Sequence, residues 1–99
     1  MDRLLQRGRP EQPHLGRLGC RALAQRQFER AAQYFNQGLA IRSDSKPLRY
    51  LHAYALCMAS RLQEAAAAVR GARRQTTQSP SDERYWSWLT QTFGLPGVQ

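Results

Sequence analysis

The most constraining feature of this 99-residue sequence is a pattern that repeats every 34 residues. Positions paired at this spacing carry the same residue or a similar one: Pro13 and Pro47, Gly19 and Ala53, Phe28 and Leu62, Ala31 and Ala65, Phe35 and Val69, and Gly38 and Ala72. Between them, apolar residues follow the three- and four-residue spacing of an amphipathic helix. Units of this length that contain two helices bury their apolar faces only against neighbouring units. The sequence therefore predicts an all-α fold of stacked helix–turn–helix units.

Helix-boundary residues divide the chain into five predicted helices. Because a proline suits the first turn of a helix, we expect the first helix to run from Pro13 to about Arg26, and the third to begin at Pro47. The second helix is expected to begin near Gln27 and the fourth at Leu62.

The fifth predicted helix has the strongest boundary signals. Ser79 precedes a proline and is a predicted N-cap, and Gly94 is a predicted helix end. We therefore expect one domain over residues 13–94, between a flexible N-terminal arm at 1–12 and a C-terminal tail at 95–99.

The residues inside the repeat resemble the motif of the tetratricopeptide repeat family, which has bulky and small residues at set places on two helices. The residues at these places are Leu15, Leu18, Gly19, Ala22, Phe28, Ala31, Phe35 and Gly38 in the first unit, and Ala53, Leu56, Leu62, Ala65, Val69 and Ala72 in the second. The resemblance implies two repeats in a short right-handed solenoid. It also implies that the fifth helix, aligned through Trp86 and Ser87, caps the stack.

Three residues depart from this motif. Ala22 is small where a bulky residue is usual, and Arg49 and His52 occupy places that are normally apolar. We therefore expect Leu48 and Leu51 to cover the seam of the third helix instead.

The resemblance also assigns a binding surface, because first-helix positions that do not pack against the second helix line the concave face in this family. Carried over by register, the predicted partner-binding residues are Cys20, Leu23, Tyr50, Tyr54, Met58, Arg84 and Trp88, and Cys57 lies on the same face. Tyr50, Tyr54 and Met58 form one stripe, which suits the apolar face of an amphipathic helix. The alternative is that two repeats curve too little to make a groove and that the aromatic residues fill the interior.

The leading functional prediction is a cytoplasmic binding module that shields a hydrophobic helix of another protein. In length and architecture the chain is similar to the small chaperones of bacterial type III secretion, which hold needle or export subunits and often need a second small protein. Tetratricopeptide domains that clamp acidic chaperone tails use lysines and asparagines on the concave face. Gly16, Cys20, Tyr50 and Tyr54 stand there instead and disfavour that role.

Charge leaves a second interpretation open. The net charge is +8, and fourteen of the fifteen cationic residues are arginines, which bind phosphate and carboxylate well. An adaptor for RNA or for an acidic partner is therefore the alternative, although the arginines are spread over every predicted helix. Only Arg70, Arg73 and Arg74 form a local cluster.

No residue pattern favours an enzyme, a cofactor or a metal site. Asp82 and Glu83 are explained by helix capping, and His14 and His52 lack the close paired spacing of zinc ligands. We expect Cys20 and Cys57 to be free, partly buried thiols. No segment approaches the roughly 20 apolar residues that a membrane-spanning helix needs, so membrane insertion is not expected.

Overall fold

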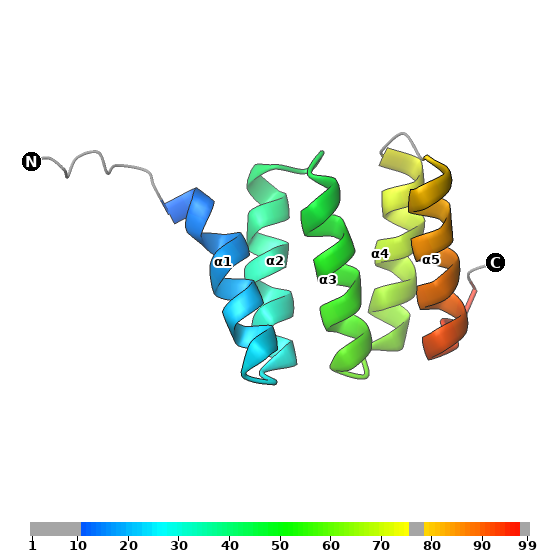
Figure 1. Cartoon of the computed structure of the whole chain (residues 1–99), viewed down its shortest axis with the longest axis horizontal. Helices are drawn as coiled ribbons and strands as arrows, with labels where there is room; N and C mark the ends of the chain where they lie inside the picture. The colour runs from blue at the N-terminus through cyan, green and yellow to red at the C-terminus, as the bar shows by residue number, and fades with distance from the viewer. Residues whose placement is uncertain (1–10, 76–78, 98–99) are drawn as a thin grey trace, which may run out of the picture.

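The computed structural model describes residues 11–75 and 79–97, and these residues form five α-helices and no strand (Figure 1). The helices are α1 (Glu11–Ala24), α2 (Phe28–Ile41), α3 (Lys46–Met58), α4 (Leu62–Gln75) and α5 (Pro80–Phe93). They stand in a row, each packed against the next, so that α1 and α5 lie at opposite ends (Figure 1). The predicted all-α arrangement of two helix–turn–helix repeats followed by a fifth helix is confirmed.

The 34-residue repeat extends to the backbone of the turns. Arg26, Ser60 and Gly94 follow α1, α3 and α5 at this spacing, and their φ angles are 61°, 64° and 61°. The next residue in each turn donates its N–H to a carbonyl five residues back: Gln27 to Ala22 at 2.8 Å, Arg61 to Leu56 at 2.9 Å, and Leu95 to Thr90 at 3.1 Å. This is the hydrogen bond of a helix end with a left-handed residue. The third copy of the turn is present even though α5 is the last described helix.

Two predicted boundaries of the first helix are wrong. The helix begins at Glu11, so residues 11 and 12 are helical and Pro13 is the third residue. A proline is tolerated there because the first N–H groups of a helix lack intrahelical acceptors. The helix ends at Ala24, not near Arg26, because Arg26 has a left-handed backbone. The rest of the predicted arm, residues 1–10, lies outside the described residues.

The third helix and the tail also differ from prediction. The third helix begins at Lys46, with Ser45 as its N-cap accepting a hydrogen bond from the backbone N–H of Leu48 at 3.4 Å. Pro47 is therefore its second residue. Leu95, which was assigned to the C-terminal tail, is only 5% exposed and belongs to the core.

Small residues allow the helices of the first repeat to pack closely. A Cβ atom at Gly19 of α1 would lie 2.4 Å from Cε1 of Phe35 in α2, far inside van der Waals contact. At the equivalent places of the second repeat, the residue on the first helix is larger (Ala53 for Gly19) and the residue on the second helix is smaller (Val69 for Phe35). Both Ala53 and Val69 are fully buried. The larger ring in the first repeat thus requires the glycine.

Other predicted repeat residues take the expected places in the core. Ala31 and Ala65 have no exposed surface, and Phe28 and Leu62 are half-buried. Leu48 packs against Gly38, where an added Cβ would lie 3.2 Å from its Cδ1 atom. Leu48 therefore covers the seam between the two repeats, as predicted from the departures at Arg49 and His52.

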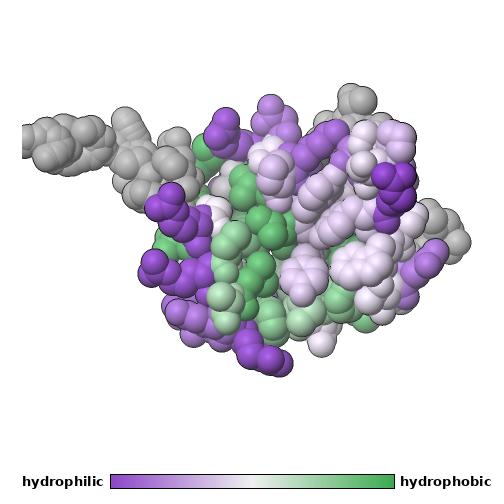
Figure 2. All heavy atoms as spheres, viewed as in Figure 1, coloured by the Kyte–Doolittle hydropathy of each residue, from purple (hydrophilic) through white to green (hydrophobic). Residues whose placement is uncertain are grey.

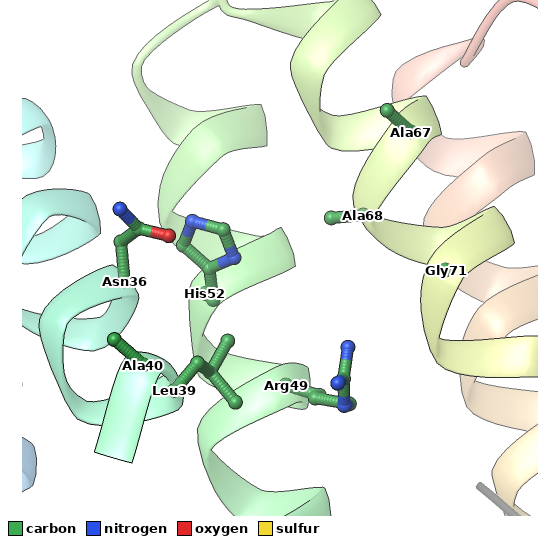
Figure 3. Close-up of a pocket in the computed structure, with 8 residues that line it drawn as sticks. All are labelled: Asn36, Leu39, Ala40, Arg49, His52, Ala67, Ala68 and Gly71. Carbon is green, nitrogen blue, oxygen red and sulfur yellow. The ribbon is translucent and has the colours of Figure 1, made fainter. Parts of the chain in front are cut away.

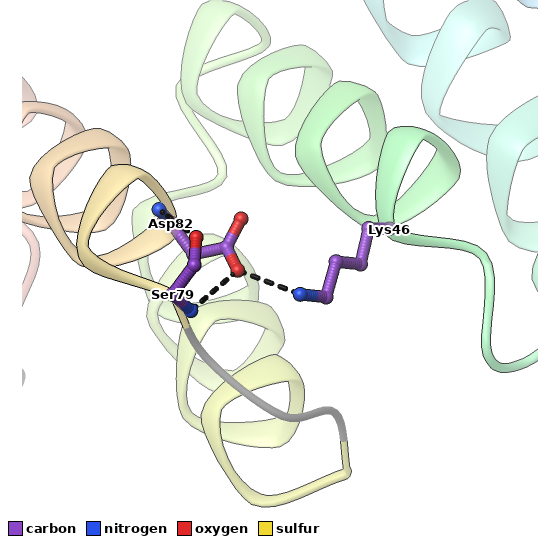
Figure 4. A network of polar contacts seen from close by, with 3 residues as sticks. All are labelled: Lys46, Ser79 and Asp82. Atoms are coloured by element: carbon purple, nitrogen blue, oxygen red, sulfur yellow. Dashed lines mark hydrogen bonds and ion pairs between the residues drawn. The ribbon is translucent and has the colours of Figure 1, made fainter.

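The fifth helix is attached by large side chains and one ion pair. Trp86 is 1% exposed and Leu89 is fully buried. Lys46 Nζ of α3 lies 2.7 Å from Asp82 Oδ2, which also accepts the backbone N–H of Ser79 at 2.8 Å (Figure 4). The Asp82 N–H donates to Ser79 Oγ at 3.2 Å, so the predicted N-cap is confirmed as a capping box.

Candidate functional site

Aromatic rings from α3 and α5 form one connected cluster. We call Tyr50, Tyr54, Tyr85, Trp88 and Phe93 the aromatic surface. Ring centroids are 4.5 Å apart for Tyr50 and Tyr85, 5.9 Å for Tyr85 and Trp88, 6.4 Å for Trp88 and Phe93, and 6.5 Å for Phe93 and Tyr54. These are favourable distances for tilted and edge-to-face ring pairs. The α5 rings thereby link the two tyrosines of α3.

Local sequence spacing explains why the rings gather. Tyr50 and Tyr54 are four residues apart and lie on one side of α3, and Tyr85 and Trp88 are three apart on α5. The Tyr85 hydroxyl donates to the backbone carbonyl of Tyr50 at 2.9 Å. The polar tip of a half-buried ring therefore has its partner, and this hydrogen bond joins the two helices.

The two tryptophans of α5, Trp86 and Trp88, differ in exposure. Trp86 is buried and lies edge-on to Tyr50, with ring centroids 5.2 Å apart. Trp88 is 49% exposed. Trp86 therefore fills the interior, whereas about half of Trp88 faces solvent.

The aromatic surface contains no Lys, Arg, His, Asp or Glu residue. Burial raises the pKa of the Tyr85 hydroxyl above its ordinary value, and the nearby Cys57 and Tyr54 raise it further. Burial also raises the pKa of the Cys57 thiol to about 11. The thiol therefore remains protonated and is a poor nucleophile. The surface offers ring faces and no reactive group.

The remaining predicted partner-binding residues lie at differing degrees of exposure. Met58 is half-buried one turn beyond Tyr54, and Leu23 of α1 is half-buried against the core. Arg84 is exposed, and its Nη2 lies 3.3 Å from Ser81 Oγ. The structure therefore joins Tyr50, Tyr54 and Trp88 through the rings of Tyr85 and Phe93. Leu23 and Arg84 lie on the outer helices.

Two cysteine predictions need correction. Cys57 was placed on the concave face but is 4% exposed, because it lies on the side of α3 that packs into the core. Cys20 was expected to be partly buried but is exposed on α1. Both thiols are free.

The register carried over from the motif missed two members of the aromatic surface. Tyr85 and Phe93 lie outside the motif places that line the concave face. The spacing of Tyr85 and Trp88 was the available signal, because residues three apart share a helix face. Phe93 had no such signal, since it follows Trp88 by five residues and joins it only at the end of the helix.

A depression separate from the aromatic surface lies between α2 and α4, with α3 as its floor (Figure 3). Its volume is about 320 Å³, and it continues into a neighbouring hollow of about 470 Å³ that shares Asn36, His52, Ala67 and Ala68. His52 and Asn36 point toward one another in it (Figure 3). Burial and the charge of Arg49 lower the pKa of His52, so the imidazole is neutral at neutral pH. Two of the three departures from the motif, Arg49 and His52, thus line a gap between the second helices of the repeats.

Figure 2 shows how residue types divide over one face of the molecule. Hydrophobic residues gather in a band down the middle, and strongly hydrophilic residues dominate the left edge, over α1.

Over residues 11–75 and 79–97, no three His, Cys, Asp or Glu side chains come together in a way that could hold a metal ion. None of the described helices combines the length and the apolar character needed to span a membrane.

Comparison with known proteins gives one match. The sequence model of a family described as tetratricopeptide repeat matches residues 22–91. This range extends from the last turn of α1 into α5 and covers most of the chain. Searches of curated proteins and of solved structures give no match.

Proposed function

Because the chain belongs to the tetratricopeptide repeat family, whose repeats are a protein–protein interaction fold, we propose that it is a non-enzymatic chaperone or adaptor. Its ligand is an amphipathic helix of another protein, held on the aromatic surface. The observation that carries this proposal is Trp88, a 49% exposed ring that contacts two other rings of that surface.

The physical argument rests on the cost of leaving such a ring in water. A large apolar side chain that is half exposed over other rings gains free energy when a partner covers it. Tryptophan and tyrosine are the residues that most often dominate binding energy at desolvated interface centres. The two tyrosines of α3 supply both ring faces and hydroxyl groups, so a helix with apolar residues three and four apart fits this surface.

The more specific form of the proposal is a cytoplasmic secretion chaperone. A secreted needle or export subunit with an exposed amphipathic helix is the partner that we propose, with a second small protein as co-chaperone. Shielding such a helix before export requires an apolar surface that binds without covalent chemistry. The aromatic surface, which contains no Lys, Arg, His, Asp or Glu residue, meets this requirement.

Capture of partners from native lysate, followed by mass spectrometry, tests the proposal. Trp88→Ala combined with Tyr54→Ala should abolish capture of the main partner and leave the circular dichroism spectrum helical. Ile41→Ala is a matched control, because Ile41 is also 49% exposed but lies at the end of α2. We expect this control to capture the partner normally.

Salt distinguishes this function from the electrostatic alternative. Capture through apolar rings should change little as ionic strength rises, whereas binding to phosphates weakens steeply. Arg74→Gln removes an exposed charge of α4 and should leave capture unchanged. Loss of capture in Arg74→Gln, with normal capture by the aromatic variant, would contradict the proposal.

A further inference from the structure

The crease between α1 and α2 is open on the side away from α3. It forms a hollow of about 280 Å³, and all its lining residues come from α1, α2 and the residues next to them. The equivalent crease of the second repeat, between α3 and α4, has α2 alongside it. No described helix lies against the first crease in this way. We call it the open crease.

The floor of the open crease is lowered by one small residue. Ala22 stands 34 residues before Leu56, which fills the corresponding place of the second repeat and is only 4% exposed. Leu18 and Tyr34, both half-buried, complete an apolar floor around Ala22. Ala22 is itself only 3% exposed, so an apolar side chain from outside would rest on it together with Leu18 and Tyr34.

The walls of the open crease are basic. Arg21 comes from α1 and Arg30 from α2, and both are exposed. Within the described part of the chain, neither guanidinium has a hydrogen bond or an ion pair. The equivalent positions of the second repeat are Ala55 and Glu64, so the outer crease carries positive charge where the inner one carries a carboxylate.

The second repeat shows how a helix occupies such a crease. There α2 lies beside α3 and α4, and the Glu29 carboxylate of α2 pairs with Arg61, the residue before α4, at 3.4 Å. The residue equivalent to Arg61 in the first repeat is Gln27, which is uncharged. A helix lying along the open crease would therefore find the positive charge at Arg21 and Arg30 instead, and carboxylates on that helix would complement it.

We propose that the open crease is a second docking site, for a helix of a partner protein that carries carboxylates facing Arg21 and Arg30 and an apolar residue above Ala22. A second copy of this chain does not fit, because its net charge is +8. The carboxylates of its α5, Asp82 and Glu83, are already paired with Lys46 and Arg73. The site lies at the end of the row opposite α5 (Figure 1), so the proposal does not depend on the aromatic surface.

The test uses a fluorescent helical peptide of alanine and leucine with glutamates along one face, and the same peptide with glutamines. Fluorescence anisotropy titrations at low salt should show that the glutamate peptide binds about tenfold or more tightly than the glutamine peptide. Arg21→Gln with Arg30→Gln should lose about tenfold or more of that affinity. Arg42→Gln with Arg74→Gln removes the same charge from exposed positions elsewhere, and its affinity should stay within about twofold of the original.

A second variant tests the hollow without changing charge. Ala22→Leu places in the first repeat the residue that the second repeat has at Leu56, and it should weaken peptide binding while the protein remains folded. Equal losses in the two double arginine variants would overturn the proposal, because net charge alone would then explain binding. Equal binding of both peptides would also overturn it. So would displacement of the glutamate peptide by a single-stranded RNA oligonucleotide whose own binding needs Arg21 and Arg30.

Discussion

The first and fifth helices, at the two ends of the row, are attached to the other helices by different contacts. In the first repeat, Gly19 lets α1 approach Phe35 so closely that a Cβ would lie 2.4 Å from the ring. At the other end, α5 is held to the stack by the bulk of Trp86, by the Tyr85 hydroxyl on the Tyr50 carbonyl, and by an ion pair. The contact between α1 and α2 requires that Gly19 has no side chain, whereas the attachment of α5 requires particular side chains. Added volume should therefore damage the first, whereas side-chain removal and acid should damage the second.

Loss of Trp86 should have the largest effect, because it is the bulkiest fully buried side chain. We expect Trp86→Ala to lower the free energy of unfolding by about 3–5 kcal/mol, the range for large-to-small changes in a core. Trp88→Ala, on the same helix but half exposed, should cost about 1 kcal/mol or less. Urea denaturation followed by circular dichroism measures both. Equal losses would mean that α5 is not attached through Trp86.

Gly19→Ala tests the close seam and should be the next largest effect. The added methyl group meets the Phe35 ring, and such overpacking costs about 1–3 kcal/mol. Gly71→Ala in α4 is a matched control, because a Cβ there meets nothing within 4 Å. Alanine favours the helix, so this control should gain about 0.5–1 kcal/mol. Thermal melting of the two variants should therefore give Tm shifts of opposite sign, and shifts of the same sign would contradict the proposed seam.

Acid should weaken the attachment of α5 in the unsubstituted protein. Hydrogen bonds from Lys46 and from the Ser79 N–H hold the pKa of Asp82 below its ordinary 3.8. A carboxylate with a depressed folded-state pKa stabilises the protein above the unfolded-state pKa, and this contribution is lost as the pH falls through the folded-state value. We expect unfolding free energy to decline below about pH 4, and Asp82→Asn should remove this part of the pH dependence.

His52 gives a separate step at higher pH. Its pKa is lowered by burial and by Arg49, so the unfolded chain binds a proton more readily than the folded one. Stability should therefore fall slightly as the pH drops below about 6.5, and His52→Gln should remove only this step. An unchanged pH profile in His52→Gln would show that the imidazole remains free to titrate in the folded protein.

Thiol labelling provides the most local measurement. Cys20 is exposed and should react rapidly with an alkylating reagent, whereas Cys57 is buried, its pKa is raised to about 11, and it lies near Tyr85 of α5. Cys57 should react only when the structure opens. If α5 detaches more easily than the repeats, Asp82→Asn should accelerate Cys57 labelling and leave Cys20 labelling unchanged. Equal acceleration at both thiols would indicate global unfolding.

Helix content and repeat register were predictable because they depend on local spacing. The motif predicted the core positions of Ala31 and Ala65. The unusual residues Arg49 and His52 predicted that Leu48 covers the seam. The end of α1 was not predictable, since arginine and serine give no sign of the left-handed backbone at residues 26 and 60. The third copy of this turn was clearer, because Gly94 is a typical residue for that conformation.

The aromatic surface was only partly predictable. Tyr50, Tyr54 and Trp88 were predicted to share one face and belong to the aromatic surface, but Tyr85 and Phe93, which link them, were left out. Which ring faces water depends on how α5 is rotated against α3, and helix periodicity does not set that rotation. The ion pair between Lys46 and Asp82 likewise joins residues 36 apart, a contact that no local pattern could indicate.

The sequence by itself determined a repeat of 34 residues, five helices, and the small residues that let helices approach, because each of these is recorded in the spacing of neighbouring residues. The tertiary structure alone decided that Trp86 is buried and Trp88 exposed, that Asp82 is paired across helices, and that Ala22 leaves a basic crease open. These properties arise where separate helices meet. They depend on the relative placement of helices, which is set by the packing of the whole stack.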